Sequence, residues 1–133
     1  MSRIDDKISE IKKYIEELDS ILPATFEEYL NLEKKAACER YVEKIMEAVT
    51  DLAFIFIKLK KLRLPEDDAD AFNVLNENKV IDEALMKRMQ DAKGMRNIIA
   101  HQYGKIDDRV VFETITTKLL KDVREFLGKA GKE

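Results

Sequence analysis

The feature that most constrains the fold is a stretch of about 38 residues, 25–62, that contains neither glycine nor proline. Apolar residues recur in it every three or four positions, which is the spacing of one face of an α-helix. A continuous helix of this length would extend about 57 Å, more than the width of a compact domain of this size. We therefore expect a long helix, opened by a capping box at Thr25 and Glu28, that bends or extends beyond its bundle.

This long segment carries two apolar stripes and a polar strip between them. One stripe comprises Tyr41, Ile45, Ala48, Leu52, Ile55, Leu59 and Leu62, and the other Val42, Met46, Val49, Ala53 and Phe56. A helix that is apolar on two sides needs two partners, so we expect its own bundle to cover one stripe and a second copy of the chain the other. The polar strip comprises Arg40, Glu43, Glu47 and Asp51. It is either a solvated face or a set of acidic partners for a buried arginine.

The remaining segments are also helical in pattern. We expect them to form helices over residues 2–22, 69–76, 82–103 and 108–127. The sequence contains no alternating strand pattern, internal repeat or glycine-rich phosphate loop. We predict an all-α fold, an up-and-down bundle of four to five helices with one long second helix. We expect the chain to form a single domain, 1–133, with an ordered core at about 4–127.

Composition limits the classes of function. The net charge is −3, so any surface that binds RNA must be local. With one cysteine, Cys38, and one histidine, His101, the chain has a poor set of zinc ligands, and we expect no metal or other cofactor. The longest apolar run, Leu52–Ile57, is too short to cross a bilayer, and we expect no signal peptide. We expect a cytoplasmic protein.

Arg96 occupies an unusual position within the fourth helical segment. The apolar stripe of that segment comprises Ile81, Leu85, Met89, Ala92, Ile99 and Tyr103. On an ideal helix Arg96 falls within this stripe. Its guanidinium stays charged, so it must pair, reach water or meet an anion. Arg96 is therefore either an ion-paired structural residue or part of an anion-binding site.

Asn97 and His101 share another face of the same segment, about 140° from Arg96 on a straight helix. Either the helix distorts near Gly104, or another chain completes a site that uses both Arg96 and His101. A histidine near a helix end is often only a favourable cation there, but it also suits proton transfer around neutrality. Tyr103 alone is most simply a core or rim aromatic residue. The basic residues just upstream form a local patch: Lys87, Arg88 and Lys93.

Metal-free RNA cleavage fits these residue types. The RNA 2′-hydroxyl is its own nucleophile, so the protein supplies a base, an acid and a cation for the phosphate. One chain has one histidine, whereas a two-fold dimer brings two histidines and two arginines to one cleft.

The octapeptide Arg96–Tyr103, RNIIAHQY, resembles the signature of the HEPN superfamily, and more narrowly of HepT-like toxins. Further similarity lies in Glu39–Arg40 and Glu47–Asp51, and in the segments before and after the motif, Leu75–Ile81 and Tyr103–Asp107. The resemblance covers roughly residues 4–127.

The resemblance implies a homodimeric, metal-independent endoribonuclease, the toxin of a type VII HepT/MntA toxin–antitoxin system. Arg96 and His101 of both subunits would be catalytic, and Asn97 would position them or the phosphate. Tyr103 would lie at the site and accept adenylyl groups from a partner nucleotidyltransferase that neutralises the toxin. Separately, the polar strip leads us to expect that Asp51, or less readily Glu47, orients Arg96. The alternatives are a non-catalytic HEPN module that binds nucleotides or a nucleotidyltransferase partner, and a generic helical oligomerisation domain.

Overall fold

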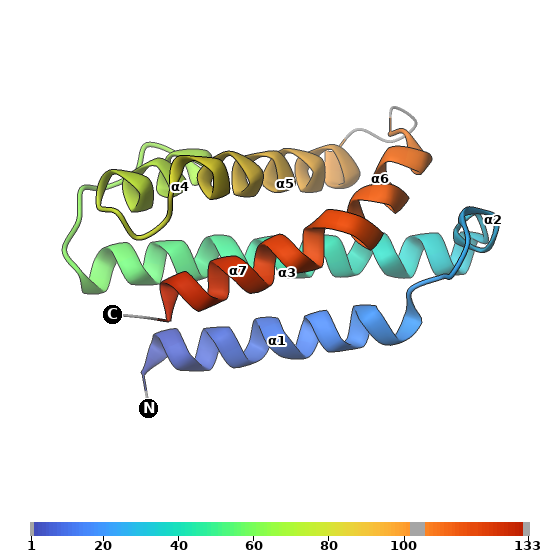
Figure 1. Ribbon diagram of the computed structural model, residues 1–133, viewed down its shortest axis with the longest axis horizontal. Coiled ribbons are helices and arrows are strands. Elements are labelled where there is room, and N and C mark those ends of the chain that lie inside the picture. The colour runs from blue at the N-terminus through green and yellow to red at the C-terminus, as the bar shows by residue number, and fades with distance from the viewer. Residues whose placement is uncertain (1, 102–105, 132–133) are drawn as a thin grey trace.

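The computed structural model describes residues 2–101 and 106–131, and these form a bundle of helices without any strand. The helices are α1 (Arg3–Ile21), α2 (Phe26–Tyr29), α3 (Leu32–Leu59), α4 (Asp68–Glu77), α5 (Glu83–His101), α6 (Asp108–Thr114) and α7 (Leu120–Ala130), with the π-helical segment η1 (Ile115–Leu119) between the last two. In Figure 1, α1, α3, α5 and α7 run side by side along the long axis, and α2 lies at one end. The predicted all-α bundle is confirmed. None of the described helices combines the length and apolar character that crossing a membrane requires.

The long stretch 25–62 is divided between α2 and α3, so the expected bend is a break between two helices. Thr25 caps α2 as predicted, with its hydroxyl oxygen accepting a hydrogen bond from the Glu28 N–H at 3.2 Å. The chain then leaves the helix at Asn31, whose side-chain oxygen accepts from the N–H groups of Glu33 and Lys34 at 3.1 Å each. An asparagine side chain that binds backbone N–H groups favours a new helix start over a continuing turn. The remaining helix, α3, has 28 residues and extends about 42 Å.

The second apolar stripe of α3 is buried within one chain. The first is also buried except at its ends, where Tyr41 is partly exposed and Leu59 is 51% exposed. In the second stripe Val42, Met46, Val49 and Ala53 are fully buried, and Phe56 is 5% exposed. Helix α1 packs against α3, and so do α4, α5 and α7. The expectation that the second stripe needs a second copy of the chain is therefore wrong, because the chain's own helices surround α3. Cys38 is part of the same core.

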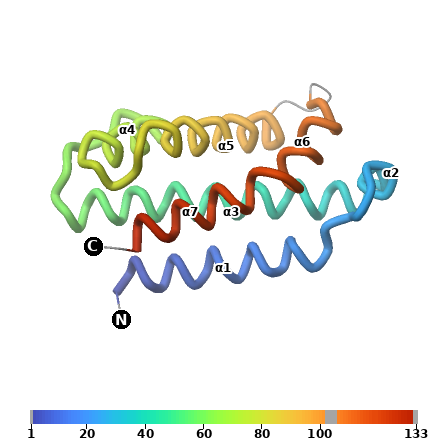
Figure 2. The backbone as a smooth tube through the Cα atoms, viewed as in Figure 1, coloured from blue at the N-terminus to red at the C-terminus, as the bar shows by residue number. Residues whose placement is uncertain are grey.

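The two C-terminal segments begin at aspartate caps. Asp82 accepts a hydrogen bond from the Leu85 N–H at 2.8 Å at the start of α5, and Asp107 accepts from the N–H groups of Arg109 and Val110 at the start of α6. The helix predicted over 108–127 is interrupted by η1 and continues to Ala130. Figure 2 shows the chain bending between α6 and α7 at this point. A π-helical turn is wider than an α-helical one and changes the direction of the chain.

Candidate active site

Arg96 lies on the buried side of α5 and reaches toward α3. The apolar stripe that precedes and follows it is buried as predicted, at Ile81, Leu85, Met89, Ala92 and Ile99. The Arg96 side chain is 16% exposed, and its Nη2 forms an ion pair with Glu47 Oε1. Its Nη1 donates to Asn97 Oδ1 at 3.2 Å, while its Nε is buried without a partner among the described residues. Arg96 is thus held in place by two contacts, and some of its N–H donors, including Nε, remain unused.

The carboxylate on Arg96 comes from Glu47 and not from Asp51, so the expectation for Asp51 is wrong. Asp51 lies one turn further along α3, is 64% exposed, and faces α1, where its Oδ2 is 3.7 Å from Lys7 Nζ. Successive turns of an α-helix do not align fully, so a residue four positions on is rotated around the axis. That rotation directs Asp51 toward α1 and Glu47 toward α5.

Asn97 connects Arg96 to a lysine that sequence reasoning placed only in a basic patch. Asn97 Oδ1 accepts a second hydrogen bond from Lys93 Nζ at 3.4 Å. The Lys93 side chain is 9% exposed, and its Nζ lies 3.2 Å from Asp68 Oδ2 in α4. We call Asp68, Lys93, Asn97, Arg96 and Glu47 the polar network of α5. The sequence signal for the lysine was its spacing of four residues from Asn97, which places both on one helix face.

His101 is the last residue of α5 and stands apart from this network. Its side chain is exposed, and the structure gives it no hydrogen bond or ion pair with another described residue. Arg96 points into the bundle, so the two predicted catalytic residues are not joined within one chain. Tyr103, the predicted acceptor of adenylyl groups, lies outside the described residues.

The predicted basic patch is not a set of free cations. Each of its members has a carboxylate partner: Lys87 with Glu83 at 3.4 Å, Arg88 with Asp122 at 2.6 Å and Glu125 at 3.2 Å, and Lys93 with Asp68 at 3.2 Å. The hydrogen bonds that Arg88 donates to Glu125 and Asp122 raise its pKa. These cations are partly neutralised, which weakens the attraction of this surface for a polyanion.

A groove of about 850 Å³ lies between α5 and the segment α6–η1–α7. Its lining includes Met95 and Ile98 from the motif helix and Val110 from α6. Ile98 is 37% exposed and Val110 is 54% exposed. The groove therefore exposes apolar surface directly beside the Arg96–His101 segment.

Comparison with known proteins gives consistent relatives. The family model described as Ribonuclease HepT-like matches residues 11–130. The chain is 24% identical over 126 residues to the mRNA nuclease HepT of Shewanella oneidensis, covering 93% of this chain and 92% of that protein. It is 25% identical over 117 residues to the tRNA nuclease HepT of Aphanizomenon flos-aquae, covering 87% of this chain and 80% of that protein.

The fold has a close counterpart among solved structures. The chain superposes with a TM-score of 0.92, at 22% identity and with full coverage of both chains, on the tri-AMPylated HEPN toxin of Shewanella oneidensis in complex with MNT antitoxin. At this identity the likeness shows the fold alone. The family model spans most of the chain, and on that basis the protein belongs to the ribonuclease HepT-like family.

Proposed function

We propose that the protein is a cytoplasmic, metal-independent endoribonuclease, the toxin of a type VII HepT/MntA toxin–antitoxin system. The observation that carries this proposal is a half-buried arginine with unused N–H donors, Arg96, on the same helix as an exposed histidine, His101. The family assignment and two relatives named as nucleases of mRNA and tRNA support RNA as the substrate.

The chemistry needs few protein groups. The RNA 2′-oxygen attacks the adjacent phosphorus, and the bond from phosphorus to the 5′-oxygen breaks. His101 takes the proton from the 2′-hydroxyl, a second imidazole gives a proton to the leaving 5′-oxygen, and Arg96 stabilises the charge on the phosphate oxygens. The products are a 2′,3′-cyclic phosphate and a 5′-hydroxyl.

The second imidazole requires a homodimer, because the chain has one histidine. The exposed position of His101 at the end of α5 supports a site shared between subunits. The apolar side chains of Ile98 and Val110 beside the motif support an interface on this side of the molecule. The dimer thus rests on α5 and α6, and not on the second stripe of α3.

The proposed antitoxin is a small nucleotidyltransferase that attaches adenylyl groups to Tyr103. The comparison structure, a tri-AMPylated toxin in complex with MNT antitoxin, supports this partner. Tyr103 lies two residues after His101 in the sequence. An adenylyl group there would add a bulky anion next to the catalytic histidine and exclude an RNA phosphate by size and charge.

One observation favours the alternative, a non-catalytic HEPN module that binds nucleotides or a nucleotidyltransferase partner. The net charge is −3, and the cations upstream of the motif are paired with carboxylates. Affinity for RNA rises with the number of phosphates that free cations neutralise. This surface has few free cations and should bind RNA weakly.

Cleavage of labelled RNA in the presence of a chelator decides between the two. The unmodified protein is assayed beside His101→Ala, with mass spectrometry to establish that Tyr103 carries no adenylyl group. Cleavage by the former and none by the latter supports metal-free chemistry at the motif. Equal cleavage by both points to contamination, and no cleavage by either favours the binding module.

A further inference from the structure

We propose that Lys93 is a positioning residue, which fixes the Asn97 side-chain amide so that its NH₂ group, and not its oxygen, is presented to the RNA phosphate. This inference rests on the proposed ribonuclease function. Lys93 lies three residues before the Arg96–Tyr103 motif, and its buried side chain would act on the motif through Asn97.

The position of Lys93 is unusual for a lysine. Its side chain is only 9% exposed. Its Nζ contacts one carboxylate oxygen, Asp68 Oδ2 at 3.2 Å, and one amide oxygen, Asn97 Oδ1 at 3.4 Å. A buried ammonium is unfavourable unless its donors are paired, so these two contacts hold Lys93 Nζ in place. Asp68 is 53% exposed and lies in the first turn of α4.

Two cations converge on the Asn97 oxygen and thereby define the orientation of the amide. Asn97 Oδ1 accepts from Lys93 Nζ and from Arg96 Nη1, and both of these groups are donors only. A reversed amide would place its NH₂ group against two positive donors. Asn97 Nδ2 has no partner among the described residues, and the side chain is exposed. Its N–H donors are therefore available to an anion.

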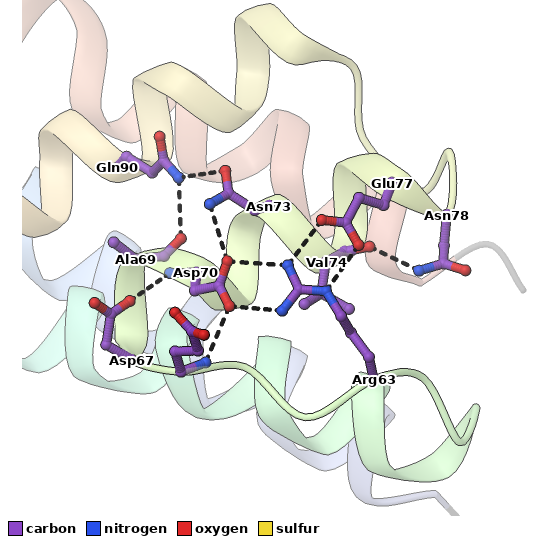
Figure 3. A network of polar contacts seen from close by, with 10 residues as sticks. Arg63, Asp67, Ala69, Asp70, Asn73, Val74, Glu77, Asn78 and Gln90 are labelled. Atoms are coloured by element: carbon purple, nitrogen blue, oxygen red, sulfur yellow. Dashed lines mark hydrogen bonds and ion pairs between the residues drawn. The ribbon is translucent and has the colours of Figure 1, made fainter.

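A purely structural role, a tie between α5 and α4, is already filled by another residue. Gln90, three positions before Lys93, donates from Nε2 to the Ala69 carbonyl at 3.0 Å and to Asn73 Oδ1 at 2.9 Å (Figure 3). These bonds join the same two helices without touching Asn97. A substitution of Gln90 therefore offers a matched control, because it removes a link between α5 and α4 without changing the contacts of the Asn97 amide.

A double-mutant cycle tests whether Lys93 acts through Asn97. We expect Lys93→Met to lower the kcat for RNA cleavage about tenfold, with little change in KM. The Asn97 NH₂ group, which donates to the phosphate, is then misplaced and not removed. In an Asn97→Ala background the same substitution should have almost no further effect. Asp68→Asn should act in the same direction but less strongly, and Gln90→Met should leave kcat unchanged. An equal loss from Lys93→Met with and without the Asn97 side chain would overturn the proposal.

The order of the Asn97 side-chain NH₂ group provides a test that needs no cleavage. Its signals in ¹⁵N-resolved NMR spectra are assigned by their loss in Asn97→Ala. We expect a high heteronuclear NOE in the unmodified protein and in Gln90→Met, and a low one in Lys93→Met and Asp68→Asn. An unchanged NOE in both of the latter variants rules out the positioning role. If the protein failed to cleave RNA, the proposed function would fall, while this measurement would still decide whether Lys93 orients Asn97.

Discussion

Two arginines of this molecule, Arg63 and Arg96, each contact carboxylates from other parts of the chain, yet their surroundings differ in kind. Arg63 follows the end of α3 and is 44% exposed. Arg96 lies within α5 and is 16% exposed. The more exposed arginine has the more complete set of partners, which is the reverse of what burial alone would favour.

Arg63 makes four hydrogen bonds to two carboxylates of α4 and so uses most of its five N–H donors. Its Nη1 and Nη2 donate to Asp70 at 2.7 and 3.0 Å, and its Nε and Nη2 donate to Glu77 at 2.9 and 2.7 Å (Figure 3). This is two-pronged pairing on both edges of the guanidinium. Asp70 also accepts from the Glu66 N–H and from Asn73 Nδ2, each at 3.0 Å. Such a cluster fixes the connection between α3 and α4 and engages both two-pronged edges of the guanidinium.

The guanidinium of Arg96 makes fewer hydrogen bonds than that of Arg63. One terminal nitrogen meets Glu47, the other meets Asn97, and Nε has no partner among the described residues. A buried donor without a partner lowers stability, and such groups are concentrated at functional sites. On the proposed function, the number of unused N–H donors, and not the presence of an ion pair, distinguishes Arg96 from the structural Arg63.

The largest effect should come from substituting the two arginines in turn. We expect Arg96→Ala to lower kcat/KM for RNA cleavage about 10³-fold, since it removes the cation on the phosphate. Arg63→Ala should leave kcat/KM within about twofold when assayed well below its Tm, since it removes only a structural cluster. Steady-state kinetics on one labelled RNA measures both. Comparable losses from the two variants would contradict the distinction.

A smaller effect should separate the two acidic residues of α3. Glu47→Gln keeps the shape of the side chain but removes the charge that holds Arg96, so we expect kcat/KM to fall about tenfold. Asp51→Asn loses only an exposed contact to Lys7 and should change kcat/KM by less than about twofold. The same kinetic assay applies. A greater loss in the Asp51 variant would restore the original expectation from the sequence.

Much of the fold followed from periodicity and caps, because these are local properties of the chain. The spacing of apolar residues placed the helices, and the capping box at Thr25 correctly marked a helix start. The break at Asn31 was missed because an asparagine inside an apolar pattern is compatible with either a helix interior or a new start. The pattern alone did not reveal that α3 lies at the centre of the bundle, which decided how both stripes are covered.

The candidate site was predictable only in part, since its partners come from distant segments. The apolar stripe of α5 placed Arg96 on the buried side correctly. The choice between Glu47 and Asp51 depends on the rotation of α3 relative to α5, which no local pattern specifies. The pairing of Lys93 with Asp68 depends on where α4 packs. Sequence spacing therefore predicts which face of a helix a residue occupies, whereas helix packing determines which distant residue it pairs with.

Stability should respond to the two arginines in opposite ways. Arg63→Met leaves Asp70 and Glu77 facing each other without a cation, so we expect Tm to fall by a few degrees. Arg96→Met replaces an incompletely paired guanidinium with an apolar side chain of similar length, so we expect Tm to be unchanged or raised. Thermal unfolding followed by circular dichroism measures both. A drop in Tm that is larger for Arg96→Met would mean that Arg96 is the structural residue.

The smallest and most specific effect concerns pH and the Arg63 cluster. Hydrogen bonds from Arg63 hold the pKa of Asp70 well below its ordinary value of 3.8 and lower the pKa of Glu77 from 4.5. A carboxylate whose pKa is depressed on folding adds stability above its ordinary pKa, and this contribution is lost as pH falls through the folded-state value. The difference in Tm between the unmodified protein and Arg63→Met should therefore be constant above about pH 5 and shrink as the pH is lowered through 4.5 and 3.8.

The Glu77 share of this difference should be the first to decline, because its ordinary pKa is the higher of the two. Asp70→Asn provides the control, since it removes the carboxyl with the larger shift and keeps Glu77 on Arg63. In that background the loss of the Arg63 contribution should begin near pH 4.5 and be complete at a higher pH than in the unmodified protein. A Tm difference that stays constant from neutral pH to pH 3 would show that the cluster holds α4 by shape and not by charge.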